Sequence, residues 1–136
     1  MAAPDYLFVY GTLRYDAGHH LHQLIRENAR DLGPATFAGR LYDFGAYPGV
    51  VDADASSAAR VHGELYEIVT HSQLVFERLD AYEECGPGFA EPTEYVRERR
   101  PVRLAADGAD YSAWIYLYNH SLAGAQFVPG GDYIKR

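Results

Sequence analysis

Glu83 is the side chain in this sequence best placed to act as a general base. In a helix predicted for residues 70–84, successive residues turn by about 100°, which directs Glu83 between Leu79 and Phe76, within an apolar arc. Burial there, and the negative end of the helix dipole, would both raise the pKa of its carboxyl group, as a general base near neutral pH requires. Two alternatives remain open: a frayed helix end with Glu83 in solvent, and a structural salt bridge to a strand arginine.

The same helical wheel divides the rest of this segment into two faces. The apolar arc also holds Leu74, Val75 and Tyr82, whereas Glu77, Asp80 and Glu84 fall outside it and are predicted to face water. Thr70 and Gln73 form a capping-box pattern at the start of the helix, and Gly86-Pro87 marks its end.

A second candidate feature is the bend in the segment YLFVYGTLR, residues Tyr6–Arg14. A glycine after an apolar strand permits positive φ and close approach of the backbone to a ligand. Successive N–H groups in such a turn can form a concavity that binds a carboxylate or a phosphate. Arg14 could add positive charge or could face solvent, and an ordinary exit from the strand is the alternative for the whole bend.

The other reactive residue types give weaker patterns. His19, His20 and His22 lie close together, but no carboxylate or cysteine stands at a recognised ligand spacing from them, so no metal site is predicted. Cys85 could act as a nucleophile if a histidine approached it in space, and a free loop thiol is the alternative. The sequence has no GxSxG, Walker or GxGxxG motif.

Two helices and five or six strands are predicted to position these groups. The predicted helices are His20–Asn28, ended by Gly33-Pro34, and Thr70–Glu84; the predicted strands are Tyr6–Tyr10, Phe37–Asp43, Arg60–Ile68, Thr93–Leu104 and Tyr111–Asn119. Asp107-Gly108 indicates a hairpin between the last two strands. Gly45–Val51 is predicted to be irregular because Pro48-Gly49 marks a turn, Asp52–Ala59 to be an exposed loop, and Phe127–Arg136 to be a loop that can fold back.

Strands that follow one another late in the chain favour an α+β fold with a curled, mostly antiparallel or mixed sheet over a doubly wound fold. In the strand Tyr111–Asn119, alternation separates an aliphatic side, which should pack, from an aromatic one. The aromatic side could line a cavity or cover a second core layer, and its members are Ser112, Trp114, Tyr116 and Tyr118.

Length and composition narrow the class of protein. The 136 residues fit one domain, 1–136, and a net charge of −7 with a pI near 5.2 argues against nucleic acid or an anionic membrane as partner. A single cysteine excludes an intrachain disulfide, and no signal-peptide pattern precedes the first strand. We therefore expect a soluble, cytoplasmic protein, in which Arg97, Arg99, Arg100 and Arg103 form a solvated or salt-bridged sheet face.

Six segments, taken in order, resemble the γ-glutamylcyclotransferase-like family, in particular its AIG2-like branch, which includes the γ-glutamylamine cyclotransferases. They are VYGTLR (Val9–Arg14), AYPGVV (Ala46–Val51), VHGELYEI (Val61–Ile68), LDAYE (Leu79–Glu83), EYVRERRPV (Glu94–Val102) and AWIYLYN (Ala113–Asn119). The resemblance implies a small mixed, mostly antiparallel β-barrel with flanking helices.

The resemblance also implies roles for individual residues. Main-chain groups of Tyr10, Gly11, Thr12 and Leu13 would bind the glutamyl end of a substrate, Glu83 would be the catalytic acid and base, and Tyr118 would be a cleft tyrosine. Two features depart from the pattern: Glu84 stands where relatives often have glycine, and the loop Cys85–Thr93 is long.

The implied reaction is the cyclisation of a γ-glutamyl amide to 5-oxoproline with release of the amine, without a cofactor or a metal. The leaving amine stays open, because a γ-glutamyl amino acid, a γ-glutamyl-lysine crosslink remnant and a protected biosynthetic intermediate share the same glutamyl end. A non-catalytic module that binds such a metabolite in the same cavity is the alternative from another class.

Overall fold

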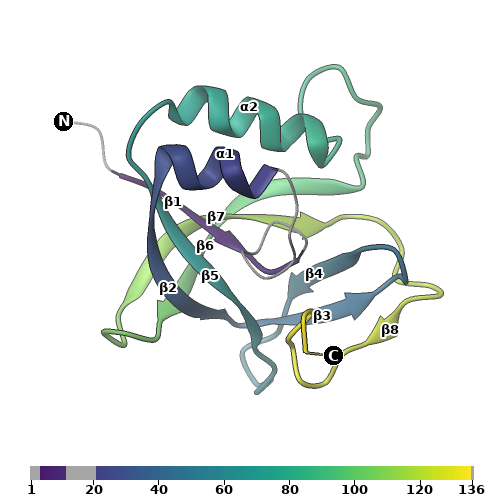
Figure 1. Ribbon diagram of the computed structural model, residues 1–136. Coiled ribbons are helices and arrows are strands. Elements are labelled where there is room, and N and C mark those ends of the chain that lie inside the picture. Colours follow the sequence, from purple (N-terminus) through teal and green to yellow (C-terminus); the bar gives the residue numbers. More distant parts are fainter. Residues whose placement is uncertain (1–3, 12–20, 136) are drawn as a thin grey trace.

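A computed structural model of the protein describes residues 4–11 and 21–135. Five strands form a closed barrel in the order β1 (Asp5–Val9), β5 (Val61–Ile68), β2 (Ala29–Phe37), β6 (Tyr95–Leu104) and β7 (Asp110–Tyr118) (Figure 1). β1 and β7 pair in parallel and close the barrel, and the other neighbours are antiparallel. The mixed, mostly antiparallel barrel implied by the resemblance is thereby confirmed.

Two helices and a smaller sheet complete the architecture. Helices α1 (Leu21–Asn28) and α2 (Ser72–Tyr82) lie together over one face of the barrel (Figure 1). The second sheet has the strand order β4 (Pro48–Asp52), β3 (Gly39–Asp43) and β8 (Gln126–Phe127), all antiparallel. The C-terminal segment folds back, as predicted. Its strand β8 pairs with β3, and the Val128 N–H donates to the Leu41 carbonyl at 2.9 Å.

The alternation predicted for the last long strand separates two layers of core. Ala113, Ile115 and Leu117 of β7 face the interior of the barrel. Tyr116 lies in the second layer, between barrel and helices, and Trp114 and Tyr118 pack against that layer. Both functions considered for the aromatic side therefore occur, since Tyr116 also lines a cavity described below.

The Gly33-Pro34 pair, predicted to end the first helix, lies inside strand β2, which begins directly after that helix ends at Asn28. The register between β2 and β5 shifts between Asp31 and Gly33, as in a β-bulge, and Gly33 has φ 104°. The Asp31 carboxylate accepts the Gly33 N–H at 2.8 Å. A bulge absorbs the extra residue and leaves the strand intact on both sides.

The segment predicted to be irregular around Pro48-Gly49 is also a strand, β4. Its turn lies earlier, where the Phe44 N–H donates to the Tyr47 carbonyl at 3.0 Å and Gly45 has φ 96°. Gly49 serves close packing instead, since a Cβ there would lie 2.9 Å from ring atoms of both Phe44 and Tyr118. Close approach of neighbouring groups is a second reason for glycine inside a strand.

Helix α2 is shorter than predicted at both ends, and its predicted capping box is wrong. The N-cap is His71, in the left-handed region with φ 53° and without a side-chain cap, and the Thr70 hydroxyl contacts His71 Nδ1. Val75, Phe76 and Leu79 are buried, as the wheel predicts, but Leu74 and Tyr82 are each 40% exposed. The apolar face in contact with the barrel is therefore narrower than the arc in the sequence.

The cluster of strand arginines forms the expected salt-bridged face. Arg99 pairs with Asp5 at 3.2 Å, Arg100 with Asp52 at 2.9 Å and Arg103 with Asp110 at 3.2 Å, while Arg97 pairs with Asp80 of α2 at 2.8 Å. Within the described ranges, neither helix has the length and apolar character needed to cross a bilayer.

Candidate functional site

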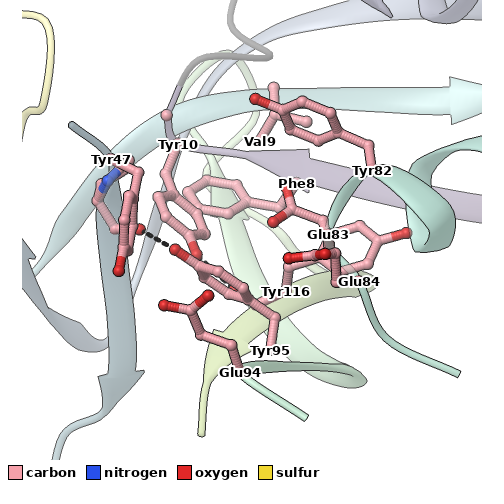
Figure 2. Close-up of a pocket in the computed structure, with 12 residues that line it drawn as sticks. Phe8, Val9, Tyr10, Tyr47, Tyr82, Glu83, Glu84, Glu94, Tyr95 and Tyr116 are labelled. Carbon is pink, nitrogen blue, oxygen red and sulfur yellow. Dashed lines mark hydrogen bonds between the residues drawn. The ribbon is translucent and has the colours of Figure 1, made fainter. Parts of the chain in front are cut away.

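A cavity of about 280 Å³ lies where the exit of β1 meets the end of α2. Its walls also include the loop between β3 and β4, the start of β6 and one residue of β7 (Figure 2). The lining residues are Phe8, Val9, Tyr10, Gly11, Tyr47, Pro48, Tyr82, Glu83, Glu84, Glu94, Tyr95 and Tyr116. Elements far apart in the sequence thus contribute to one hollow.

Glu83 is the C-cap residue of α2, and its backbone N–H donates to the Leu79 carbonyl at 2.9 Å. Its side chain is partly buried in the wall of the cavity. Burial, followed by the negative charges of Glu94 and Asp80, raises the pKa of Glu83 from 4.5 to about 7. In the described part of the chain Glu83 lines a cavity, and the nearby strand arginine, Arg97, pairs with Asp80 instead.

Asp80, predicted to face water, is instead bound from two strands. Its carboxylate accepts Arg97 Nε at 2.8 Å and Nη2 at 3.1 Å, and it accepts the Tyr116 hydroxyl at 2.6 Å. The Arg97 guanidinium lies 4.5 Å from the ring centroids of both Phe76 and Trp114. Bidentate, charge-assisted bonds of this kind fix geometry, so they hold the last turn of α2, and Glu83 with it, against β6 and β7.

Two tyrosines supply buried phenols to the cavity. The Tyr10 hydroxyl donates to the Tyr116 carbonyl, and the Tyr95 hydroxyl donates to the Pro48 carbonyl. Burial raises the pKa of both phenols, and the charge of Glu83 raises them further. Both phenols therefore stay neutral at any physiological pH, with their O–H groups donated to these backbone carbonyls.

The mouth of the cavity carries the carboxylate of Glu94, which lies near two further tyrosines, Tyr47 and Tyr118. The nearby Glu94 carboxylate is the main cause that raises the pKa of Tyr47 to about 12, and burial followed by the charge of Glu94 raises the pKa of Tyr118. Tyr47 stacks on Phe44 with ring centroids 5.3 Å apart, and Phe44 also contacts the Tyr118 ring at 4.5 Å. The carboxylate directly precedes β6, and the rings come from β7 and from the loop between β3 and β4.

The structure brings together several of the predicted site residues. Tyr10, Gly11 and Glu83 line the cavity. Tyr118 is not one of the lining residues, and its ring lies behind the wall against that of Tyr95, with centroids 5.4 Å apart. Thr12 and Leu13, like Arg14, fall outside the described residues.

The cavity residues that the sequence did not single out include Tyr47, Glu94 and Tyr95. Each lies inside a segment on which the family resemblance rests, AYPGVV or EYVRERRPV. That signal marked the segments but did not indicate which of their side chains face a common space.

The alternative nucleophile has an unsuitable environment. Cys85 is buried outside the lining of the cavity, with its sulfur 3.9 Å from Asp80 Oδ1. Burial, followed by the charges of Asp80 and Glu83, raises the pKa of the thiol to about 12, which opposes formation of a thiolate. Among residues 4–11 and 21–135, no group of three or more His, Cys, Asp or Glu side chains could hold a metal ion.

Glu84 occupies a backbone conformation that favours glycine, with φ 54° directly after the C-cap of α2. A left-handed conformation costs a side chain other than glycine about 1 kcal/mol. We expect Glu84→Gly to raise the free energy of unfolding by about that amount, measured by urea denaturation. Glu77→Gly, on the exposed face inside α2, is the matched control and should lower it by about 1 kcal/mol; equal losses in both variants would contradict the account.

Comparison with known proteins places the whole barrel in one family. Residues 7–135 match the family described as gamma-glutamyl cyclotransferase, AIG2-like. The chain belongs to this family. The segments quoted from the sequence had indicated the same branch.

Individual members of the AIG2-like family cover nearly all of the chain. The gamma-glutamylcyclotransferase family protein YtfP of Escherichia coli K12 is 31% identical over 131 residues, 96% of either chain. The solution structure of ytfP from Escherichia coli superposes with a TM-score of 0.64 at 30% identity, covering 96% of this chain and 97% of that one. A gamma-L-glutamyl-butirosin B gamma-glutamyl cyclotransferase of Niallia circulans is 35% identical over 115 residues, which are 83% of this chain and 66% of that protein.

Proposed function

We propose that this protein is a γ-glutamylcyclotransferase that converts a γ-glutamyl amide into 5-oxoproline and the free amine. The observation that carries the proposal is the meeting, in one cavity, of Glu83 with a pKa near 7 and the bend at Tyr10–Gly11. Membership of the AIG2-like family supports the same reaction class.

The reaction needs no external nucleophile. The α-amine of the substrate attacks its own γ-carbonyl carbon, a new C–N bond closes the five-membered ring, and the original amide C–N bond breaks. Because the nucleophile is already in the molecule, the enzyme has to hold the glutamyl chain bent. Orientation of this kind can supply on the order of 7–11 kcal/mol at best.

Glu83 takes a proton from the α-ammonium group and returns it to the leaving nitrogen. The carboxylate is well matched to this task, since a general base works best with a pKa near the operating pH and that of Glu83 is about 7. The main-chain groups of Gly11, with those of Thr12 and Leu13, would bind the substrate's α-carboxylate. The tetrahedral oxyanion needs a donor, and loop N–H groups are candidates. The hydroxyl of Tyr10 or of Tyr95 would first have to turn away from the backbone carbonyl to which it donates.

The direct test is incubation of the protein with γ-glutamyl amides and detection of 5-oxoproline by mass spectrometry. Formation of 5-oxoproline and amine in equal amounts supports the proposal, and a thiol alkylating agent should leave this activity intact because Cys85 lies outside the cavity lining. Binding of a γ-glutamyl amide or of 5-oxoproline without any product would identify a non-catalytic module instead.

The pH dependence of kcat/KM should report the ionisation of Glu83. A base is active only when deprotonated, so activity should rise with pH through a midpoint near 7, the raised pKa of Glu83. Of the two carboxylates whose charge raises the pKa of Glu83, Glu94 has the larger effect. Glu94→Gln removes that charge and should move the acidic limb to lower pH. An acidic limb that stays in place in Glu94→Gln would belong to another group, such as the substrate.

A further inference from the structure

We propose that Arg97 is a positioning residue for the reaction: by binding Asp80 it fixes the end of α2 that carries Glu83, and it keeps the charge of Asp80 from acting in full on Glu83. Arg97 is not among the residues that line the cavity, so it acts through α2 and not on the substrate. This inference rests on the proposed function and extends it to a residue outside the site.

The end of α2 gathers negative charge. Asp80 lies in the last turn, Glu83 is the C-cap and Glu84 follows it, and the last turn contains no basic residue. The negative end of the helix dipole lies at the same point and disfavours carboxylates there. A cation from another element can offset these charges and hold the helix end in place.

Arg97 of β6 supplies this cation. Its Nε and Nη2 donate to separate oxygens of Asp80 at 2.8 and 3.1 Å, and its guanidinium lies 4.5 Å from the ring centroids of Phe76 and Trp114. Two parallel bonds fix the angle between the two groups as well as their distance. The Tyr116 hydroxyl also donates to Asp80, at 2.6 Å, so the helix end is tied to both β6 and β7.

This ion pair is less exposed than the next one along the same strand. The exposed fractions of the side chains are 24% for Arg97 and 23% for Asp80, against 43% for Arg99 and 31% for Asp5. Exposed ion pairs contribute little, whereas solvent and salt screen partly buried charges less. Loss of Arg97 should therefore have a larger effect than loss of Arg99.

The position of Asp80 on α2 links the ion pair to the site. Residues three apart on a helix are neighbours, and the charge of Asp80 is one of the causes that raise the pKa of Glu83. A carboxylate paired with a guanidinium acts at a distance as a dipole, whose field falls off faster than that of a lone charge. Without Arg97, Asp80 would act on Glu83 as a lone negative charge.

The other ionisable groups around Glu83 cannot provide this compensation, because all of them are acids. They are Tyr10 of β1, Asp80 of α2, Glu84 and Cys85 after α2, Glu94 directly before β6 and Tyr95 in β6. The lining residues within the described part of the chain include no lysine, arginine or histidine. Compensation of the Asp80 charge therefore comes from outside the cavity, from Arg97.

The test measures kcat, KM and the pH profile of 5-oxoproline formation in Arg97→Met. We expect kcat to fall by up to about 10²-fold, the cost of misplacing a reacting group by about 1 Å, with little change in KM because the bend at Gly11 is untouched. The acidic limb of kcat/KM should move to higher pH, since the uncompensated charge of Asp80 raises the pKa of Glu83 further. A merely structural role would not move this limb.

Two further variants separate position from charge. Arg97→Lys keeps the positive charge but loses the planar pair of donors, so kcat should fall while the acidic limb stays in place. Arg97→Met combined with Asp80→Asn removes both charges, so its acidic limb should lie at or below that of the unaltered protein. Neither variant leaves a charge without its partner, so both should fold, which urea denaturation verifies, and both carry the test if Arg97→Met alone does not fold.

Arg99→Met is the matched control. Arg99 lies two residues along the same strand, and its guanidinium also lies over the Trp114 ring, at 4.6 Å from the centroid. It pairs with Asp5, which belongs to β1 and not to α2. The change should leave both kcat and the acidic limb unaltered.

Two results would overturn the inference and leave the proposed function standing. One is an Arg97→Lys variant whose kcat equals that of the unaltered protein. The other is an acidic limb that stays in place in Arg97→Met or, where that variant does not fold, moves to higher pH in the double variant. If the unaltered protein forms no 5-oxoproline, the proposed function itself fails and this inference fails with it.

Discussion

Glu83→Gln is expected to lower kcat for 5-oxoproline formation by about 10²–10⁴-fold, the usual contribution of a general acid or base. Glutamine keeps the size of the side chain and the backbone hydrogen bond of the C-cap to Leu79, but cannot accept the ammonium proton. The measurement is turnover of a γ-glutamyl amide above pH 8, where the unaltered carboxylate is ionised. Turnover within a few-fold of the unaltered protein would eliminate Glu83 as the base.

The stability of the same variant shows whether lost activity reflects lost structure. Folding raises the pKa of Glu83 from 4.5 to about 7, so the folded state binds this proton more tightly than the unfolded state does. The resulting stabilisation is present below about pH 4.5 and disappears as the pH rises through 7. Glutamine does not ionise, so Glu83→Gln should resist urea better than the unaltered protein at pH 8, and this advantage should shrink in acid.

Leu79→Ala is expected to reduce the free energy of unfolding by about 2–5 kcal/mol, the range for truncating a buried leucine. Leu79 has an exposed fraction of 0% and packs beneath α2 in the layer that contains Val75 and Tyr66. It also lies one turn before Glu83 and accepts the N–H of that residue. The cavity left by the missing methyl groups therefore opens beside the functional end of the helix.

Urea denaturation measures this loss, and Leu74→Ala provides the matched control. Leu74 lies on the same helix but is 40% exposed, and surface substitutions usually change stability by no more than about 0.5 kcal/mol. Similar losses for the two variants would mean that the helix contributes little through its packing. At temperatures where Leu79→Ala remains folded, we expect KM to rise as well, because the wall that bears Glu83 is less firmly held.

Local periodicity was enough to predict that the Glu83 side chain points toward the protein interior and that β7 has an aliphatic and an aromatic face. Both follow from repeats of 3.6 and two residues, which depend only on the segment itself. The hairpin between β6 and β7 was predictable for the same reason, since Asp107-Gly108 supplies the turn and Gly108 has φ 67°.

Features set by distant partners were not predictable in this way. The start of α2 is organised by Asn28 of α1, whose carbonyl accepts the N–H groups of Val69 and Thr70 and whose side chain meets His71 Nδ1 at 3.0 Å. A capping box depends only on neighbouring residues, and here the bonds from Asn28 fix the backbone at the start of the helix instead. Asp80 was expected in water for a similar reason, because its partners Arg97 and Tyr116 lie on two strands later in the chain.

The bulge in β2 and the strand β4 show that pairing with neighbouring strands can keep a segment extended although its residues favour a turn. Gly33-Pro34 and Pro48-Gly49 are both pairs that favour turns, but each lies in a strand whose partners extend beyond it. The residues at the cavity mouth depend on these strands, because β4 and the loop before it carry Pro48 and Tyr47. Their convergence on Glu94 is a property of the assembled sheets and not of any one segment.

The parallel pairing of β1 with β7 has a consequence for the order in which the molecule can be completed. Tyr6 and Leu7 pair with Ala113 and Trp114, so β1 keeps one edge open until β7 has left the ribosome. Contacts between such distant segments form slowly, and an open strand edge is where unfinished chains associate. The pocket needs Tyr116 from β7, so its walls are incomplete until that strand has been made and has paired with β1.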